Sequence, residues 1–370
     1  MLFCTRDTKS LRDSPVSLNR LSAMASISHV LLLATIFAQG CISVPTQPAN
    51  DGHLAPVRLL YEYPLGTWLE NIAIRPTGEL LLTFANSAHV DQLDPFAASS
   101  TPVTVATLPD RTSNFGIAET APDAFAVLHG NFSLGSGTVP GSWSVWSLSF
   151  RSAHSSAAQV SKIVDLSDAN FTNGLTAVPN SPYLLAGDIR TGAIYRISTS
   201  TKSVDTPFAS VPSLTNLTAP ATDPIYGDVA TNGLHISGSA LYFANTGQGI
   251  LGAIPIRADG RPAGEAHVVA SAQPDLEYDD FALKDGFAYM VTGYGDSIER
   301  VRLDGKKRGR VIAGKDNDTT IAQPTSAAFG RTEKDREVLY VVTAGGLAAP
   351  LGNVTVGAQV LAIDLKGCRW

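Results

Sequence analysis

Residues 173–197 read NGLTAVPNSPYLLAGDIRTGAIYRI, and residues 232–256 read NGLHISGSALYFANTGQGILGAIPI. Each stretch begins with Asn-Gly-Leu, runs into a short apolar segment, turns, and continues into a second apolar segment that ends in small or polar residues. Apolar and polar residues alternate with a period of two, which is typical of β-strands that bury one face. The two stretches therefore indicate a repeated unit built from β-hairpins.

Four further segments repeat this form. They are ENIAIRPTGELLLTFAN from Glu70, NFGIAETAPDAFAVLHGN from Asn114, DFALKDGFAYMVTGYGDSIERVRL from Asp280, and PTSAAFGRTEKDREVLYVVTAGG from Pro324. Six units spaced by about 50 residues match the length of a four-stranded propeller blade. The sequence therefore predicts an all-β protein, a six-bladed β-propeller with four-stranded blades.

The two ends of the predicted propeller also carry strands. One strand candidate, 57–63, precedes the first unit, and another, 360–365, follows the sixth. We expect these N- and C-terminal strands to pair and close the ring, because an open array would expose strand edges. On this basis residues 44–370 form a single propeller domain, and residues 1–43 form a signal peptide with an N-terminal extension.

The N-terminal segment has the pattern of a secretory signal. Residues 30–38 form an apolar run followed by small residues, as in a signal-peptide h-region. The run is too short to span a hydrocarbon core of about 30 Å, so we expect no membrane span. Whether translation starts at Met1 or Met24 stays open. We predict entry into the secretory pathway and secretion.

Two further features agree with secretion. Five sequons are candidate glycosylation sites, at Asn131, Asn170, Asn216, Asn317 and Asn353. Of the three cysteines, Cys4 is lost with a signal peptide, whereas Cys41 and Cys368 can form a disulfide if cleavage leaves Cys41 in the mature chain. Both states of this pair stay open, and neither provides a CxxC metal or redox site.

Composition excludes several classes of function. The chain of 370 residues has 27 Lys and Arg against 33 Asp and Glu, a net charge of −6, so we expect no nucleic-acid partner. With 44% hydrophobic and 16% charged residues, the chain has the composition of a folded protein with a large core. We expect a monomer that binds small molecules.

Polar residues recur at the start of the leading strand in four units. These residues are Glu70, Asn173, Asn232 and Asp280. In a propeller the leading strands surround the central channel, so we expect these side chains to converge at one mouth. Carboxylate and amide oxygens suit Ca²⁺ or Mg²⁺, and the lack of His and Cys argues against zinc. Asn-Gly and Asp also form turns at strand starts, but recurrence in four blades favours a site.

The same residues carry a resemblance to a known family. LENIAIRPTGELLL around Glu70, the NGL context of Asn173 and Asn232, DDFAL around Asp280 and the segment from Pro324 resemble the gluconolactonase and senescence-marker (regucalcin) propeller superfamily over residues 57–365. The resemblance implies that Glu70, Asn173, Asn232 and Asp280 bind one divalent cation. It also implies that Asp280 is the general base of a lactone hydrolase, since a bound cation polarises a carbonyl and acidifies water.

One position departs from the pattern of the family's lactonases. These typically carry an Arg two residues before the Asn matched by Asn173, whereas this chain has Phe171. An aromatic residue there favours an apolar or conjugated ligand. Trp68, Phe84, Tyr278 and Tyr294 are candidates to extend such a wall, although aromatic residues also pack between blades. We interpret His235 as a core histidine and Asp279 as a solvated neighbour of Asp280.

Among fungal members, TWLENIAIR and the Gly-rich last blade resemble the secreted hetero-Diels-Alderases of tropolone sesquiterpenoid biosynthesis. The resemblance implies a [4+2] cycloaddition that joins a tropolone o-quinone methide to a humulene-type alkene in the channel, with no cofactor required. We predict that the tropolone oxygens are bound by Asn173, Asn232, Asp280 or Thr231, and that Phe171, Trp68 and Tyr294 line the substrate site. The Ca²⁺- or Mg²⁺-dependent lactonase and a non-catalytic secreted binding propeller remain as alternatives.

Overall fold

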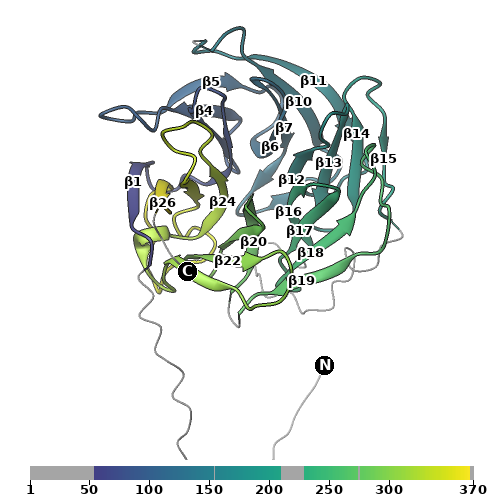
Figure 1. The fold of residues 1–370 in the computed structure, drawn as a ribbon. Coiled ribbons are helices and arrows are strands. Elements are labelled where there is room, and N and C mark those ends of the chain that lie inside the picture. Colours follow the sequence, from purple (N-terminus) through teal and green to yellow (C-terminus); the bar gives the residue numbers. More distant parts are fainter. Residues whose placement is uncertain (1–53, 154, 210–228, 274–275, 367–370) are drawn as a thin grey trace, which may run out of the picture. The chain divides into compact units, whose positions relative to one another are not determined.

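The computed structural model describes residues 54–153, 155–209, 229–273 and 276–366. Their strands form six four-stranded antiparallel sheets arranged around a central axis (Figure 1), so the predicted six-bladed β-propeller is confirmed. Besides strands, the described residues contain a short 3-10 helix, η1 (Thr319–Ile321). None of these ranges holds a helix long and apolar enough to cross a membrane.

The chain divides into two units, Met1–Asp51 and Gly52–Trp370, and the propeller belongs to the second. Several sequence predictions fall outside the described residues. These are the signal peptide with its boundary after residue 43, the cysteines Cys4, Cys41 and Cys368, and the sequon at Asn216.

The first three blades follow one another along the chain. Blade one contains β2 (Leu69–Ile74), β3 (Leu80–Phe84), β4 (His89–Leu93) and β5 (Val103–Thr107). Blade two contains β6 (Ser113–Ala121), β7 (Ala124–Gly130), β10 (Trp143–Ser149) and β11 (Gln159–Leu166), with a small inserted hairpin of β8 (Phe132–Ser133) and β9 (Gly137–Thr138). Blade three contains β12 (Thr172–Ala177), β13 (Tyr183–Asp188), β14 (Ile194–Ser198) and β15 (Val204–Asp205).

The remaining blades complete the ring. Blade four contains β16 (Thr231–Ser237), β17 (Ala240–Asn245), β18 (Ile250–Pro255) and β19 (His267–Ser271). Blade five contains β20 (Tyr278–Lys284), β21 (Phe287–Thr292), β22 (Ser297–Arg302) and β23 (Arg310–Gly314). Blade six contains β24 (Pro324–Phe329), β25 (Val338–Thr343) and β26 (Gln359–Asp364), and its fourth strand is β1 (Val57–Glu62) from the start of the propeller.

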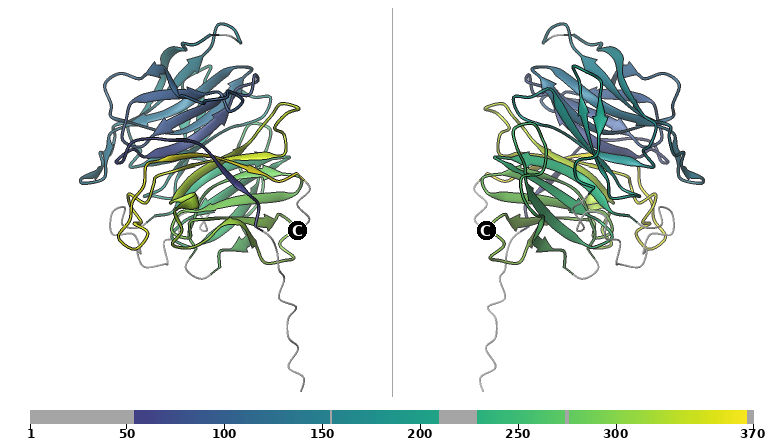
Figure 2. Two further views of the ribbon diagram at one scale, coloured as in Figure 1. Left: turned by 90° about the vertical axis from the view of Figure 1, so that its left-hand side faces the viewer. Right: turned by 90° about the vertical axis from the view of Figure 1, so that its right-hand side faces the viewer.

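The pairing of β1 with β26 closes the propeller as predicted. The two strands run antiparallel, with Val57 opposite Ile363 and Glu62 opposite Gln359. The edge that the last blade would otherwise expose is therefore covered by the chain's own first strand. Figure 2 shows β1 and β26 crossing the same side of the propeller.

The hydrophobic core lies mainly between neighbouring blades. Leu81 of blade one, for example, packs in one buried cluster with Phe125 and Val127 of blade two. The leading strands β2, β6, β12, β16, β20 and β24 contact one another in sequence around the channel. The packed blades therefore hold the starts of these six strands at fixed positions around one mouth.

Each leading strand carries a register shift near its start. The shift lies between Leu69 and Asn71 in β2, and the corresponding positions of the other blades shift in the same way. A bulge of this kind adds one unpaired residue and changes the direction of its side chain. In the first five blades a residue at the bulge lines the channel mouth; these residues are Glu70, Phe115, Asn173, Asn232 and Asp279.

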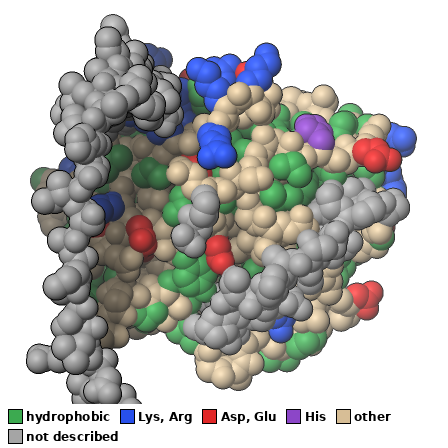
Figure 3. All heavy atoms as spheres, turned by 90° about the horizontal axis from the view of Figure 1, so that it is seen from below, with side chains coloured by type: hydrophobic (Ala, Val, Ile, Leu, Met, Phe, Trp, Pro, Cys, Tyr) green, Lys and Arg blue, Asp and Glu red, His purple; other side chains and the backbone are tan. Residues whose placement is uncertain are grey.

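One surface loop differs from the acidic balance of the whole chain. The connection between β22 and β23 carries three consecutive exposed cations, Lys306, Lys307 and Arg308. They border a shallow hollow next to β19. In Figure 3 Lys and Arg side chains gather at one edge of a face that elsewhere carries charges of both signs. Overall composition did not reveal this local basic loop.

Candidate active site

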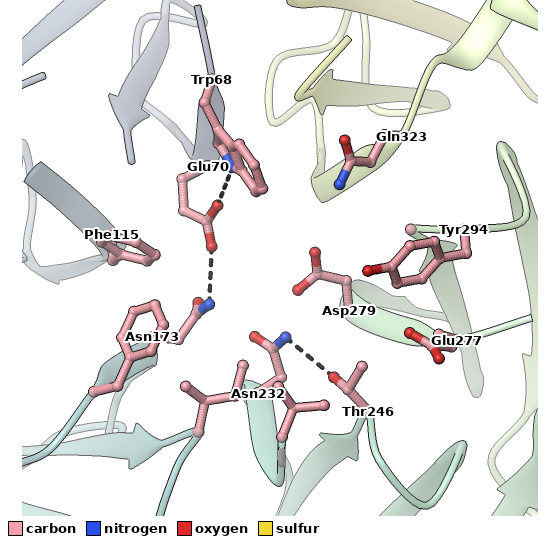
Figure 4. Close-up of a pocket in the computed structure, with 14 residues that line it drawn as sticks. Trp68, Glu70, Phe115, Asn173, Asn232, Thr246, Glu277, Asp279, Tyr294 and Gln323 are labelled. Atoms are coloured by element: carbon pink, nitrogen blue, oxygen red, sulfur yellow. Dashed lines mark hydrogen bonds between the residues drawn. The ribbon is translucent and has the colours of Figure 1, made fainter. Parts of the chain in front are cut away.

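A pocket opens where the leading strands begin. About 550 Å³ of space lies between its lining residues, a figure that includes open solvent. Side chains from all six blades contribute to its lining (Figure 4). The lining combines aromatic and aliphatic side chains with amide and carboxyl groups; the lining residues used below are Trp68, Glu70, Phe115, Phe171, Asn173, Ile189, Val229, Asn232, Thr246, Glu277, Asp279, Tyr294 and Gln323.

Glu70 is held in one orientation by two donors. The indole Nε1 of Trp68 donates to Glu70 Oε2 at 2.6 Å, and Asn173 Nδ2 donates to Glu70 Oε1 at 2.9 Å. Burial, partly offset by these two hydrogen bonds, raises the pKa of Glu70 to about 7. The group can therefore exchange a proton near neutral pH.

Asn232 presents an oxygen without a hydrogen-bond partner. Thr246 Oγ1 donates to the carbonyl oxygen of Tyr278 at 2.8 Å, so it accepts at 3.1 Å from Asn232 Nδ2. This contact fixes the orientation of the amide and leaves its Oδ1 buried with no partner among the described residues. Figure 4 shows the amide end of Asn232 directed into the pocket. A buried acceptor in this state is costly, which points to a ligand or cation that completes it.

Asp279 is the carboxyl group that blade five contributes to the pocket. Burial, together with the nearby Glu70 and Asp280 carboxylates, raises the pKa of Asp279 well above its usual range. The raised pKa favours the protonated carboxylic acid, the form that can donate a hydrogen bond. The expectation that Asp279 is only a solvated neighbour was wrong.

Asp280 lies outside this pocket lining, in contrast to our prediction that it converges with Glu70, Asn173 and Asn232. Its Oδ2 accepts from Ser326 Oγ at 2.6 Å and from Asn71 Nδ2 at 3.1 Å, and its Oδ1 lies 2.9 Å from His235 Nε2. The side chain is buried in this network. His235 is accordingly a partner of Asp280, not a histidine surrounded only by apolar residues.

The bulge in β20 explains the difference between the two aspartates. The register shifts between Tyr278 and Phe281, so Asp279 takes the place that Asn173 and Asn232 hold in their blades. The next position is Gly174 or Gly233 in blades three and four and Asp280 in blade five. A Cβ on Gly233 would lie 2.2 Å from Asp280 Oδ1, so this glycine leaves the room that the Asp280 carboxylate occupies.

Phe171 lies at the centre of an aromatic wall. Its ring stacks on Phe132 (5.3 Å between centroids, 25° between planes) and on Trp143 (5.4 Å, 23°), and it meets Phe115 edge to face at 5.2 Å. Phe132 belongs to the hairpin inserted in blade two, and it also meets Trp68 at 6.5 Å. The predicted aromatic lining at Phe171 thus has a supporting layer of rings behind it.

The other predicted substrate residues divide into two groups. Trp68 and Tyr294 line the pocket. Thr231 and Phe84 are buried outside its lining. Tyr278 is also buried, and its hydroxyl donates to Glu299. Whether any of these side chains binds a substrate stays a prediction.

Sequence reasoning missed several lining residues, among them Phe115, Thr246, Glu277 and Gln323. A signal for Asp279 was present, because Asp279-Asp280-Phe281 matches Asn173-Gly174-Leu175 when the apolar third residues are aligned. No comparable signal marks Gln323, since nothing in its local sequence shows that it lies at the channel.

The oxygen donors of the pocket fit a hard divalent cation. Among the described residues, no three His, Cys, Asp or Glu side chains cluster closely enough to hold a metal on their own. A cation in this pocket would therefore need amide oxygens besides the carboxylates of Glu70 and Asp279. The buried Oδ1 of Asn232 that lacks a partner is the kind of ligand that Ca²⁺ and Mg²⁺ accept.

Two curated proteins are similar to the chain over most of its length. It is 25% identical over 374 aligned positions to a putative hetero-Diels-Alderase of Phoma sp., covering 92% of this chain and 99% of that protein. It is 28% identical over 347 positions to the putative hetero-Diels-Alderase asR5 of Sarocladium schorii, with 84% of each chain covered. The predicted resemblance is confirmed. No family model matches the chain.

Solved structures confirm the fold. Regucalcin from Agrobacterium tumefaciens, described as a calcium-binding protein, has a TM-score of 0.57 at 16% identity, covering 84% of this chain and 96% of that one. A gluconolactonase from Xanthomonas campestris has a TM-score of 0.53 at 16% identity, covering 85% and 91%. At these identities the likeness concerns the propeller fold and not the reaction.

Proposed function

We propose that this pocket catalyses an intermolecular hetero-Diels–Alder reaction. The heterodiene is a tropolone-derived o-quinone methide, and the alkene is of the humulene type. The observation that carries the proposal is that one pocket combines the aromatic wall around Phe171 with the polar side chains of Glu70, Asn232 and Asp279. The names of the two sequence relatives support a hetero-Diels–Alder reaction, without naming its reactants.

The reaction needs orientation more than proton transfer. Loss of water from a hydroxymethyl precursor generates the O=C–C=CH₂ heterodiene. Its oxygen and its terminal carbon each bond to one alkene carbon, so three π bonds become two σ bonds and one new C=C bond. No net proton or electron is exchanged in this step. Holding both reactants in register can supply up to about 7–11 kcal/mol of barrier reduction.

The polar side chains of the pocket are suited to bind the heterodiene. In its protonated form, which the raised pKa favours, Asp279 donates a hydrogen bond to the heterodiene oxygen and draws electron density towards it. When water is lost from the precursor, Asp279 gives its proton to the departing hydroxyl group, and the ring hydroxyl that becomes the heterodiene carbonyl returns a proton to Asp279. The Oδ1 of Asn232, buried without a partner, accepts a hydrogen bond from the hydroxyl that neighbours the ring carbonyl.

The aromatic and aliphatic side chains of the pocket are suited to bind the alkene. A humulene-type hydrocarbon has no hydrogen-bonding group, so its binding energy comes from contact with apolar surface. Phe171, Phe115 and Trp68 provide that surface, and Ile189 and Val229 extend it. Rings that are packed against one another cannot rearrange freely, so the alkene meets a wall of fixed shape.

A second candidate function is divalent-metal-dependent lactone hydrolysis. The fit of the oxygen donors to a hard cation favours it. Glu70, Asn173, Asn232 and Asp279 would hold the cation, which when bound polarises a carbonyl oxygen. Both carboxyl groups would have to be deprotonated for this. In this hypothesis Asp279 replaces Asp280 as the general base, because Asp280 is occupied by three neighbouring groups.

Incubation of the purified protein with a quinone-methide precursor and humulene tests the proposal. We expect a single enantiomer of the adduct, formed with and without EDTA, whereas the reaction without protein gives a racemic adduct. Racemic adduct formed at the background rate would contradict the proposal. A parallel assay with simple lactones covers the second candidate: hydrolysis that EDTA abolishes would support it.

Localisation and modification remain proposals that accompany this function. We propose a protein of the secretory pathway that is glycosylated at some of its sequons. Asn317 and Asn353 are exposed, whereas Asn131 and Asn170 are half-buried. The mass shift on treatment of the secreted protein with an endoglycosidase would report the occupied sites.

A further inference from the structure

Gln323, at the start of blade six, has an unusual backbone conformation for its sequence context. Its φ is +53°, in the left-handed region that residues other than glycine rarely adopt, and it directly precedes Pro324, which disfavours this region further. The conformation is enforced by neighbours. The backbone N–H of Gln323 donates to Asp296 Oδ1 at 2.9 Å, and its carbonyl accepts from the N–H of Ala344 at 2.8 Å.

The side chain of Gln323 is equally constrained. Its Oε1 accepts from the backbone N–H of Ala348 at 3.0 Å and of Ala349 at 3.4 Å. Both neighbours are donors, so the atom that faces them must be the amide oxygen and not the nitrogen. The Nε2 group is consequently turned towards the pocket, as Figure 4 shows.

A purely structural role does not require this arrangement. Two backbone N–H groups can be satisfied by any acceptor, and glycine would adopt a φ of +53° at lower cost. Strained backbone at a residue that lines a pocket is a recurrent feature of functional sites. The side chain is 6% exposed overall, so the donor is rigid before any ligand arrives.

We propose that Gln323 is a substrate-binding residue whose Nε2 donates a hydrogen bond to the ring carbonyl oxygen of the ligand. The inference rests on the proposed function for its ligand class. Gln323 supplies a donor, and Oδ1 of Asn232, which lacks a hydrogen-bond partner, supplies an acceptor on the opposite side of the pocket (Figure 4), so the two residues suit a ligand that carries both a carbonyl and a hydroxyl. Gln323 then selects for the carbonyl and Asn232 for the hydroxyl.

The test measures binding of two probes by isothermal titration calorimetry in EDTA. Tropolone carries both the carbonyl and the hydroxyl, whereas 2-methoxytropone keeps only the carbonyl. Gln323→Glu retains an oxygen for Ala348 and Ala349 but replaces the donor by an acceptor. Gln323→Gly relieves the backbone strain and removes the donor, so a failure to fold in one variant does not prevent the test.

Gln359→Glu is the matched control. Gln359 is buried in the same blade, accepts from the N–H of Ala322 at 3.0 Å and donates to the carbonyl of Thr319 at 2.8 Å, but it does not line the pocket. We expect both Gln323 variants to bind both probes roughly tenfold more weakly or worse, in line with loss of one buried hydrogen bond. The control should keep wild-type affinity even if its melting temperature falls.

Wild-type affinity for both probes in both Gln323 variants would overturn the inference, as would absence of probe binding by the wild-type protein. The adduct assay, run in parallel, separates this inference from the proposed function. Gln323-dependent binding without enantioselective adduct would refute the cycloaddition and leave the role of Gln323 intact. Adduct formed by Gln323→Glu at the wild-type rate would refute the role of Gln323 and leave the cycloaddition intact.

Discussion

Replacing Phe171 by leucine tests the aromatic wall directly. The Phe171 ring makes three aromatic contacts, with Phe115, Phe132 and Trp143. At about 0.5–1.5 kcal/mol for each pair, Phe171→Leu should lower the free energy of unfolding by about 1.5–4.5 kcal/mol. Leucine is preferred to arginine, because Phe171 is 3% exposed and a buried unpaired charge would unfold the site rather than probe it.

The substitution should impair function as well as stability. Leucine leaves a gap in the wall, so the alkene loses its fixed approach to the heterodiene, and we expect adduct formation to slow by about tenfold or more. Phe84→Leu is the matched control. Phe84 is buried in blade one outside the pocket lining, and its ring centroid lies 5.4 Å from that of Tyr63 and 4.3 Å from that of His89.

Two measurements decide the outcome. Calorimetric melting gives the loss of stability for both variants, and chiral chromatography gives the rate and enantiomeric ratio of the adduct at a temperature where both are folded. The reasoning requires that both variants lose stability and that only Phe171→Leu loses rate or selectivity. Unchanged rate and selectivity in a folded Phe171→Leu protein would refute the role of the wall.

The remaining predictions concern charged groups. Asp280→Asn should lower the free energy of unfolding by about 2–3 kcal/mol, because it weakens hydrogen bonds to a charged group, and it should keep wild-type affinity for tropolone. Asp279→Asn should instead lower the affinity for tropolone and leave the stability of the fold nearly unchanged. Differential scanning calorimetry measures the stability of both variants, and titration calorimetry measures their affinity for tropolone. Burial raises the pKa of Glu70 from 4.5 to about 7, so the folded state binds this proton more tightly than the unfolded chain and stability falls as pH rises through that window. Urea titrations at pH 5 and pH 8 should show this fall in wild type and a smaller one in Glu70→Gln. Asp123→Ala should cost about 3–5 kcal/mol, because it leaves the buried guanidinium of Arg75 without the carboxylate that it meets at 2.8 and 2.6 Å; a denaturant midpoint close to wild type would contradict this.

Much of the fold was predictable because its signals are local. Period-two alternation and turn residues recur in each unit, so the number of blades follows from counting repeats. The closing pair of β1 and β26 follows from a strand candidate left over at each end. Glu70, Asn173 and Asn232 could be assigned to one pocket because repeated units place equivalent residues at equivalent positions around the axis.

The sequence by itself thus determined the six-bladed propeller, its closure and three of the polar residues at its mouth. Only the tertiary structure decided that Asp279 and not Asp280 joins them, because one residue added by a bulge reverses which side chain faces the channel. The same holds for Phe132 and Gln323. Their positions depend on an inserted hairpin and on contacts with distant backbone, and such long-range packing leaves no periodic trace in the chain.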